Sequence, residues 1–111
     1  MKQNQFTRAQ ERVKVVQRPG LTRTTLSYNN DLMICHFHEE KDTKIELHTH
    51  LAVQNGYVLK GKIRFFLEDG VEFIALPGSA YVFDSMEPHS SIALEETELI
   101  ESFTPMRPEY L

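Results

Sequence analysis

Two histidines end the segment Lys44-Ile45-Glu46-Leu47-His48-Thr49-His50, in which polar and apolar side chains alternate. Such alternation predicts an extended strand, where side chains two positions apart point to the same side. We therefore expect one face of this strand to carry Lys44, Glu46, His48 and His50. A face this polar does not suit a plain apolar core, so we expect it to line a wet cavity.

The spacing of the two histidines suits a shared metal ion. Their Cα atoms should lie about 6–7 Å apart, because an extended strand rises about 3.3 Å per residue. Gln54 begins the next expected strand, and His89 follows Pro88 later in the chain. Three imidazoles and an amide oxygen predict one divalent transition metal, namely Ni, Zn, Fe or Mn, on His48, His50, Gln54 and His89. The alternatives are that the histidines have no ligand role and that Gln54 hydrogen-bonds a neighbouring backbone group.

The rest of the chain consists of short segments rich in Val, Ile, Phe, Tyr and Thr, separated by turn residues such as Asp69-Gly70. This rhythm predicts an all-β sandwich or barrel. The only weak helical candidate is Gln5–Arg12, which could equally be a mobile arm or a strand donated to a partner subunit. We expect strands over Val13–Gln17, Leu21–Tyr28, Leu32–His38, Thr43–His50, Gln54–Lys60, Ile63–Leu67, Val71–Leu76, Ala80–Phe83, Pro88–Ala93 and Glu98–Phe103.

Two late strands also carry polar side chains on one face. Alternation places His89 with Ser91, and Glu101 with Phe103. A barrel could aim both faces inward, toward the face with the His-x-His pair.

Other polar or reactive residues are expected to have ordinary roles. His36 and His38 are also two positions apart but lack ligand-type partners, so we expect solvent-facing or interface histidines. Glu39-Glu40 should belong to a solvated loop. Cys35 is the only cysteine, which excludes an internal disulfide, and we expect it to pack as a small apolar residue.

Length and charge limit the classes of function. The chain has 111 residues, enough for one domain with its own core, and a net charge of -4 that argues against a nucleic-acid partner. No apolar run approaches the roughly 18 residues that a membrane span needs, and the N-terminus lacks the apolar core of a signal peptide. The cytoplasm is therefore the expected location. Neither a phosphate-binding Gly-rich loop nor a nucleophile elbow is present.

The order of these residues resembles the two motifs of the cupin family. The first reads His48-Thr49-His50, Gln54 and Gly61, and the second reads Pro77-Gly78 followed by Pro88-His89. The resemblance implies a double-stranded β-helix, the cupin jelly-roll barrel, over residues 29–105. An N-terminal arm and strands over 1–28 and a tail over 106–111 would complete a single domain. Gln54 replaces the family's usual acidic ligand, which leaves more positive charge on the ion and favours Lewis-acid chemistry.

A narrower resemblance lies in residues Glu101–Leu111, which are similar to the tail of the small pectin-degradation cupins. Those cupins linearise unsaturated uronates at a site of three histidines and one glutamine, and Gln54 matches that glutamine. This resemblance implies a catalytic role for Glu101 and Arg107, and substrate binding by Phe103 and Arg107. The family acid is typically aspartate, so Glu101 places its carboxylate one methylene further out.

The leading prediction is thus a metal-dependent isomerase or tautomerase that ketonises an acidic sugar of the unsaturated uronate type. A non-catalytic cupin that binds or senses a small ligand is the second reading, and a metal-dependent dioxygenase the third. An inward-facing Glu101 near Arg107 would favour catalysis, and an outward-facing one would favour the binding module. We also expect a homodimer, because a second copy would protect open sheet edges.

Overall fold

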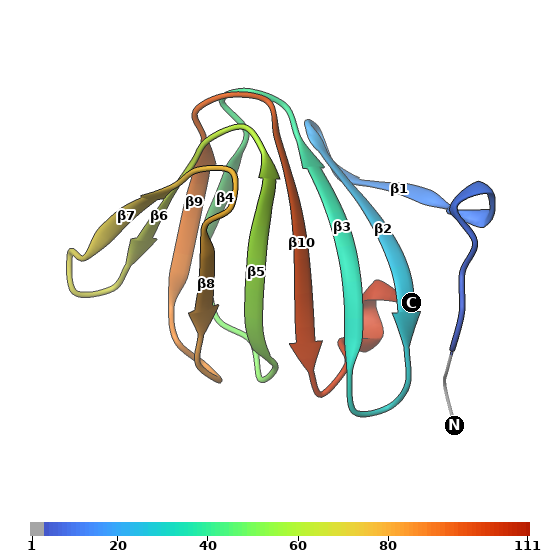
Figure 1. Cartoon of the computed structure of the whole chain (residues 1–111). Coiled ribbons are helices and arrows are strands. Elements are labelled where there is room, and N and C mark those ends of the chain that lie inside the picture. Colours follow the sequence, from blue (N-terminus) through green and yellow to red (C-terminus); the bar gives the residue numbers. More distant parts are fainter. Residues whose placement is uncertain (1–3) are drawn as a thin grey trace.

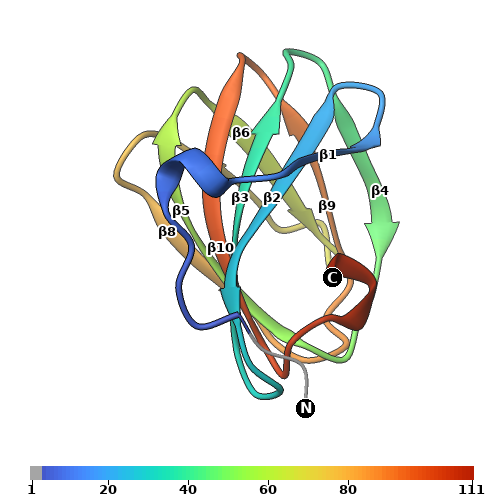
Figure 2. The ribbon, with the colours of Figure 1, turned by 90° about the vertical axis from the view of Figure 1, so that its right-hand side faces the viewer.

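The computed structural model describes residues 4–111 as two antiparallel β-sheets. The larger sheet has the order β1-β2-β3-β10-β5-β8, and the smaller one the order β4-β9-β6-β7. Figures 1 and 2 show the two sheets facing each other. The strands are β1 (Lys14–Arg18), β2 (Leu21–Tyr28), β3 (Met33–Glu39), β4 (Lys44–His48), β5 (Val53–Lys60), β6 (Ile63–Leu67), β7 (Glu72–Ala75), β8 (Ala80–Phe83), β9 (His89–Ala93) and β10 (Thr97–Thr104).

This architecture confirms the predicted all-β jelly roll. All ten expected strands form, and the bounds of β2, β6 and β8 coincide with the expected ones. The weak helical candidate Gln5–Arg12 forms only a 3-10 turn, η1 (Ala9–Glu11), preceded by a backbone bridge between Asn4 and Tyr28. The first three residues of the expected arm lie outside the described part of the chain. None of the helical turns in residues 4–111 could cross a membrane.

Alternation along the central strands builds the core. On β3, Met33, Cys35 and Phe37 are buried, and on β10 so are Leu99 and Phe103. Cys35 packs as expected, and burial raises the pKa of its thiol to about 11, so the thiol stays protonated at neutral pH.

Strand β4 departs from the expected alternation. Ile45 pairs with Ser91 and His48 pairs with His89. Between these two pairs the chain advances three residues on β4 but only two on β9. The extra residue is a β-bulge, which changes the face to which the following side chains point. As a result Ile45 and His48 line the interior while Lys44 and Glu46 are exposed. The predicted polar face was therefore wrong for both of these residues.

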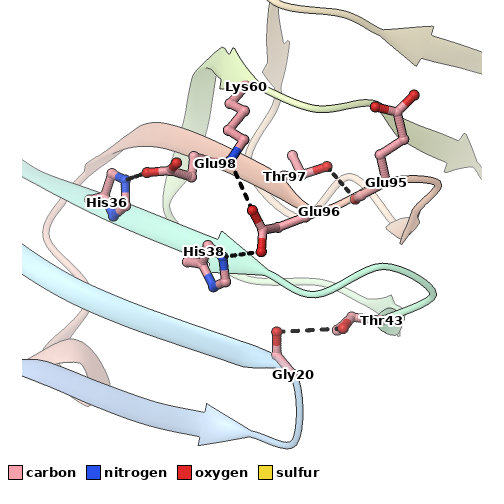
Figure 3. A network of polar contacts seen from close by, with 9 residues as sticks. All are labelled: Gly20, His36, His38, Thr43, Lys60, Glu95, Glu96, Thr97 and Glu98. Carbon is pink, nitrogen blue, oxygen red and sulfur yellow. Dashed lines mark hydrogen bonds and ion pairs between the residues drawn. The ribbon is translucent and has the colours of Figure 1, made fainter.

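His36 and His38 lie on the outer face of β3, in the network of Figure 3. His36 Nε2 lies 2.9 Å from Glu98 Oε1, and His38 Nε2 lies 3.4 Å from Glu96 Oε2. Lys60 also pairs with Glu96, at 2.9 Å. These side chains form a surface ion-pair network, whose members contribute little individually to stability.

The β5–β6 turn depends on Gly61, which has φ +93°. A Cβ atom there would lie 2.2 Å from the backbone oxygen of Glu96. Gly78 has a similar φ of +90°, but a Cβ there would meet nothing within 4 Å. The two glycines therefore separate the cost of the left-handed backbone from the cost of a clash.

We expect Gly61→Ala to destabilise the protein more than Gly78→Ala. The left-handed backbone should cost each variant about 1–2 kcal/mol. The clash should cost Gly61→Ala a further 1–3 kcal/mol, roughly the range for overpacking. Urea unfolding measures both values. Equal losses in the two variants would contradict the role of the close backbone contact.

Candidate metal centre

Three histidines converge at one end of the space between the sheets. His48 ends β4, His50 follows it in the loop, and His89 begins β9 as the pairing partner of His48. One ligand atom from each imidazole lies within 4.8 Å of the other two. The three side chains could therefore hold one metal ion.

Backbone carbonyls fix the orientation of all three rings. The Nδ1 atom of His48 lies 2.7 Å from the oxygen of Glu46, and that of His50 lies 2.8 Å from the oxygen of Ala52. His89 Nδ1 makes the equivalent contact with Glu87, also at 2.8 Å. A carbonyl oxygen can only accept, so each Nδ1 carries the proton and each Nε2 keeps a free lone pair. This arrangement is typical of metal-binding histidines.

His89 gives the clearest sign of a missing partner. Its Nε2 is buried and has no hydrogen-bond partner among the described residues, and its ring stacks on Phe83 at 4.3 Å between centroids. Burial lowers the pKa of His89 to about 4 and also lowers the pKa of His48. Both rings are thus neutral at pH 7, which is the form that binds a metal.

Gln54 completes the arrangement with an amide oxygen. Its Nε2 donates a hydrogen bond of 2.7 Å to Oε2 of Glu101, which fixes the direction of the amide. Its Oε1 consequently lies 2.9 Å from Nε2 of His50. With the His50 proton on Nδ1, two acceptors face each other at this distance. A cation between them would satisfy both, so these residues fit a metal ion.

Glu101 lies on the inner face of β10 and is only 6% exposed. Oε2 of Glu101 accepts hydrogen bonds from Gln54 and from the hydroxyl of Tyr81, the latter at 2.6 Å. Burial raises the pKa of the Glu101 carboxyl, while these two hydrogen bonds and nearby Arg107 act in the opposite direction. The side chain therefore faces the interior, toward Gln54 and Arg107.

Sequence reasoning missed Tyr81, which reaches Glu101 across the strand that separates them. Gly56 on β5 pairs with Glu101 on one side and with Tyr81 on the other. A Cβ atom at Gly56 would lie 2.4 Å from the phenol ring of Tyr81. A glycine inside a strand often marks such a close approach, and this was the available indication.

The tail places Arg107 against two aromatic rings. Its guanidinium lies 5.2 Å from the centroid of Phe103 and 4.2 Å from that of Tyr110, in the short turn η2 (Pro108–Tyr110). One nitrogen donates to the Tyr110 hydroxyl at 2.9 Å, and another to Glu109 at 3.3 Å. Nε is buried without a partner among the described residues. Phe103 is 1% exposed, and its ring lies 6.0 Å from that of His50.

A cavity of about 60 Å³ lies among most of these groups, but neither His50 nor Tyr81 lines it. It has room for a few water molecules, and an adjoining pocket of about 160 Å³ shares His48, Arg107 and Tyr110 with it. Glu39 also lines the cavity, which corrects the expectation that it belongs to a solvated loop. The predicted residues that line it are His48, Gln54, His89, Glu101, Phe103 and Arg107.

Comparison with known proteins agrees with this geometry. The Cupin domain family matches residues 35–101, more than half of the chain. The chain is a cupin. It is 32% identical over 94 residues to the pectin degradation protein KdgF of Dickeya dadantii, covering 83% of this chain and 84% of that protein.

Solved structures of similar proteins have the same fold. KdgF from Halomonas sp. superposes with a TM-score of 0.89 at 28% identity, covering 97% of this cupin and 99% of that chain. An RmlC-like cupin from Shewanella frigidimarina superposes with a TM-score of 0.93 at 24% identity, covering both chains fully.

We expect divalent transition metals to stabilise this cupin through its histidines. Free metal at 100 times Kd should add about 2.7 kcal/mol, or about 10 °C in Tm. His89→Ala should lose most of this shift. Thermal unfolding after chelation, with and without added Ni²⁺, Zn²⁺ or Mn²⁺, measures the effect.

His38→Ala is the matched control, because His38 has the same His-x-His spacing but lies on the outer face. It should keep the full metal-dependent shift. A shift that survives His89→Ala and disappears in His38→Ala would refute the site.

Proposed function

We propose that this cupin is a metal-dependent isomerase or tautomerase that linearises unsaturated uronic-acid sugars into their open keto forms. The observation that carries the proposal is the inward-facing Glu101, which lines one cavity with His48, His89 and Arg107. The likeness to two KdgF proteins, one of them named for pectin degradation, supports the substrate class.

The histidines and Gln54 would hold a divalent transition metal, whose Lewis acidity would polarise a ring or carbonyl oxygen. Glu101 would move the proton. The isomerisation leaves the composition of the sugar unchanged, because the proton lost when the ring opens is balanced by the proton gained when the enol becomes a ketone. Both hydrogen bonds to Glu101 end on Oε2. Oε1 is therefore the oxygen we assign to proton transfer.

Arg107 would bind the carboxylate of the uronate. Its planar guanidinium suits a carboxylate, and its buried Nε has a hydrogen to donate. The contacts with Phe103 and Tyr110 hold the side chain in place. Phe103 would form the apolar wall beside the sugar ring.

The same observation weighs against the non-catalytic alternative. Glu101 faces the cavity together with Arg107, as expected of a catalytic acid, whereas a cupin that only binds or senses a small ligand has no need of a proton carrier there. For a dioxygenase, the described residues provide no comparably specific observation.

We expect Glu101→Gln to abolish most of the activity. General acid–base catalysis contributes typically about 10²–10⁴-fold, so kcat should fall by that factor while Gln54 keeps a hydrogen-bond partner. The assay follows the loss of ultraviolet absorbance of unsaturated galacturonate or guluronate with metal-loaded protein. Glu98→Gln is the control, because Glu98 lies on the outer face of the same strand, paired with His36.

Absence of turnover in the metal-loaded wild type would overturn the proposed function. Equal rates in Glu101→Gln and the wild type would remove the proton-transfer role of Glu101.

We further propose a cytoplasmic homodimer. Strand β1 lies at the edge of the larger sheet, and its Val16 is exposed, as is the preceding Val13. A second copy would cover these apolar side chains and the unpaired backbone groups of the edge. Light scattering at micromolar concentration should give twice the chain mass, and Val16→Lys should shift the protein toward monomer. A monomeric wild type would refute the dimer.

A further inference from the structure

Glu39 lies at the end of β3, where three strands bring a second set of polar groups to the cavity. Leu21 on β2 pairs with Glu39 on one side and with Arg18 of β1 on the other. On its other side Glu39 pairs with Thr97 of β10. Arg18 lines the adjoining pocket. The ends of these strands therefore place an acid inside the cavity and a cation at its side.

The Glu39 side chain is buried but incompletely satisfied. It is 3% exposed, and its Oε1 has no hydrogen-bond partner within residues 4–111. The neighbouring lining is apolar, with Leu21, Phe37 and Leu99. A buried polar group without a partner is costly, and such groups are rare in native proteins. An apolar side chain would be more stable at this buried position. The presence of a carboxyl group therefore indicates that Oε1 binds a ligand.

The surroundings of Glu39 favour its neutral form. Burial and, to a smaller extent, Glu101 on β10 raise the pKa of its carboxyl while Arg18 on β1 lowers it, and the net pKa is about 8. A neutral carboxyl carries a proton that it can donate, in addition to oxygens that can accept. This combination suits a sugar hydroxyl, which also donates and accepts.

We propose that Glu39 is a further substrate-binding residue, whose carboxyl group hydrogen-bonds a hydroxyl of the sugar bound beside the histidine cluster. The inference rests on the proposed function for the class of ligand. It places Glu39 in the lining that also contains His89, and Glu39 pairs with Thr97 on β10, four residues before Glu101. Glu39 would thus help to select sugars by the position of a hydroxyl.

The test measures binding of D-galacturonate, a saturated probe, to the metal-loaded protein by calorimetry. Glu39→Leu should weaken binding by about tenfold, the effect of one lost hydrogen bond. Glu39→Gln should stay within about threefold, because the amide still donates and accepts. Glu40→Leu is the matched control and should bind as the wild type does, since Glu40 is the next residue but is exposed.

Wild-type affinity in Glu39→Leu, or no galacturonate binding by the wild type, would overturn the inference. The proposed function is judged separately. If the wild type binds galacturonate but does not convert unsaturated uronates, that function fails and Glu39 can still be a binding residue. If it converts them and Glu39→Leu has the wild-type KM and Kd, only the inference fails.

A stability measurement keeps the test independent of activity and of the folding of Glu39→Leu. The folded-state pKa of about 8 exceeds the ordinary value of 4.5, so stability is full below pH 4.5 and falls as pH rises through 8. Glu39→Gln removes this loss. Its Tm advantage over the wild type should therefore grow between pH 5 and pH 9, whereas Glu40→Gln should show no such trend. A constant difference would mean that Glu39 finds a polar partner in the free protein, which would overturn the inference.

Discussion

The candidate site depends on three backbone carbonyls that hold three imidazole rings through Nδ1. Because each contact spans two residues along the chain, the local backbone path alone sets each ring. One ligand atom from each ring then lies within 4.8 Å of the other two. The fold adds the pairing of β4 with β9, which brings His48 beside His89, and the bulge in β4, which turns His48 inward. A regular strand with Ile45 facing inward would have aimed His48 outward.

A second polar layer lies directly behind the histidines. Glu101 is buried in a β-sheet interior and is tolerated there because Gln54 and Tyr81 both donate to it. Tyr81 can do so only because Gly56 lacks a side chain at the point of crossing. The apolar core and the polar site are thus built from the same strands. On the inner face of β10, the apolar Leu99 and Phe103 lie on either side of Glu101.

The sequence predicts the ten strands and most of the candidate site, because turn residues and alternation are local properties. The residues that alternation misplaces or misses depend on non-local geometry. A bulge is set by pairing with a partner strand, so Lys44 and Glu46 could not be placed from their own segment. Tyr81 on β8 reaches Glu101 on β10 across β5. Glu39 ends β3 inside the cavity rather than in a loop, because β2 and β10 extend far enough to pair with it.

The position of the acid distinguishes this site from one in which a carboxylate binds the metal itself. Gln54 directs its oxygen toward His50 and its amide group toward Glu101, so it separates the negative charge from the histidine cluster by one residue. Three neutral imidazoles and an amide would leave the charge of a bound dication largely uncompensated. Such an ion would polarise an oxygen strongly. A carboxylate that bound the metal could not also carry a proton, whereas Glu101 can. In the proposed function, glutamine in place of an acidic ligand would leave a bound metal a stronger Lewis acid and would leave Glu101 free to transfer the proton during enol-to-keto conversion.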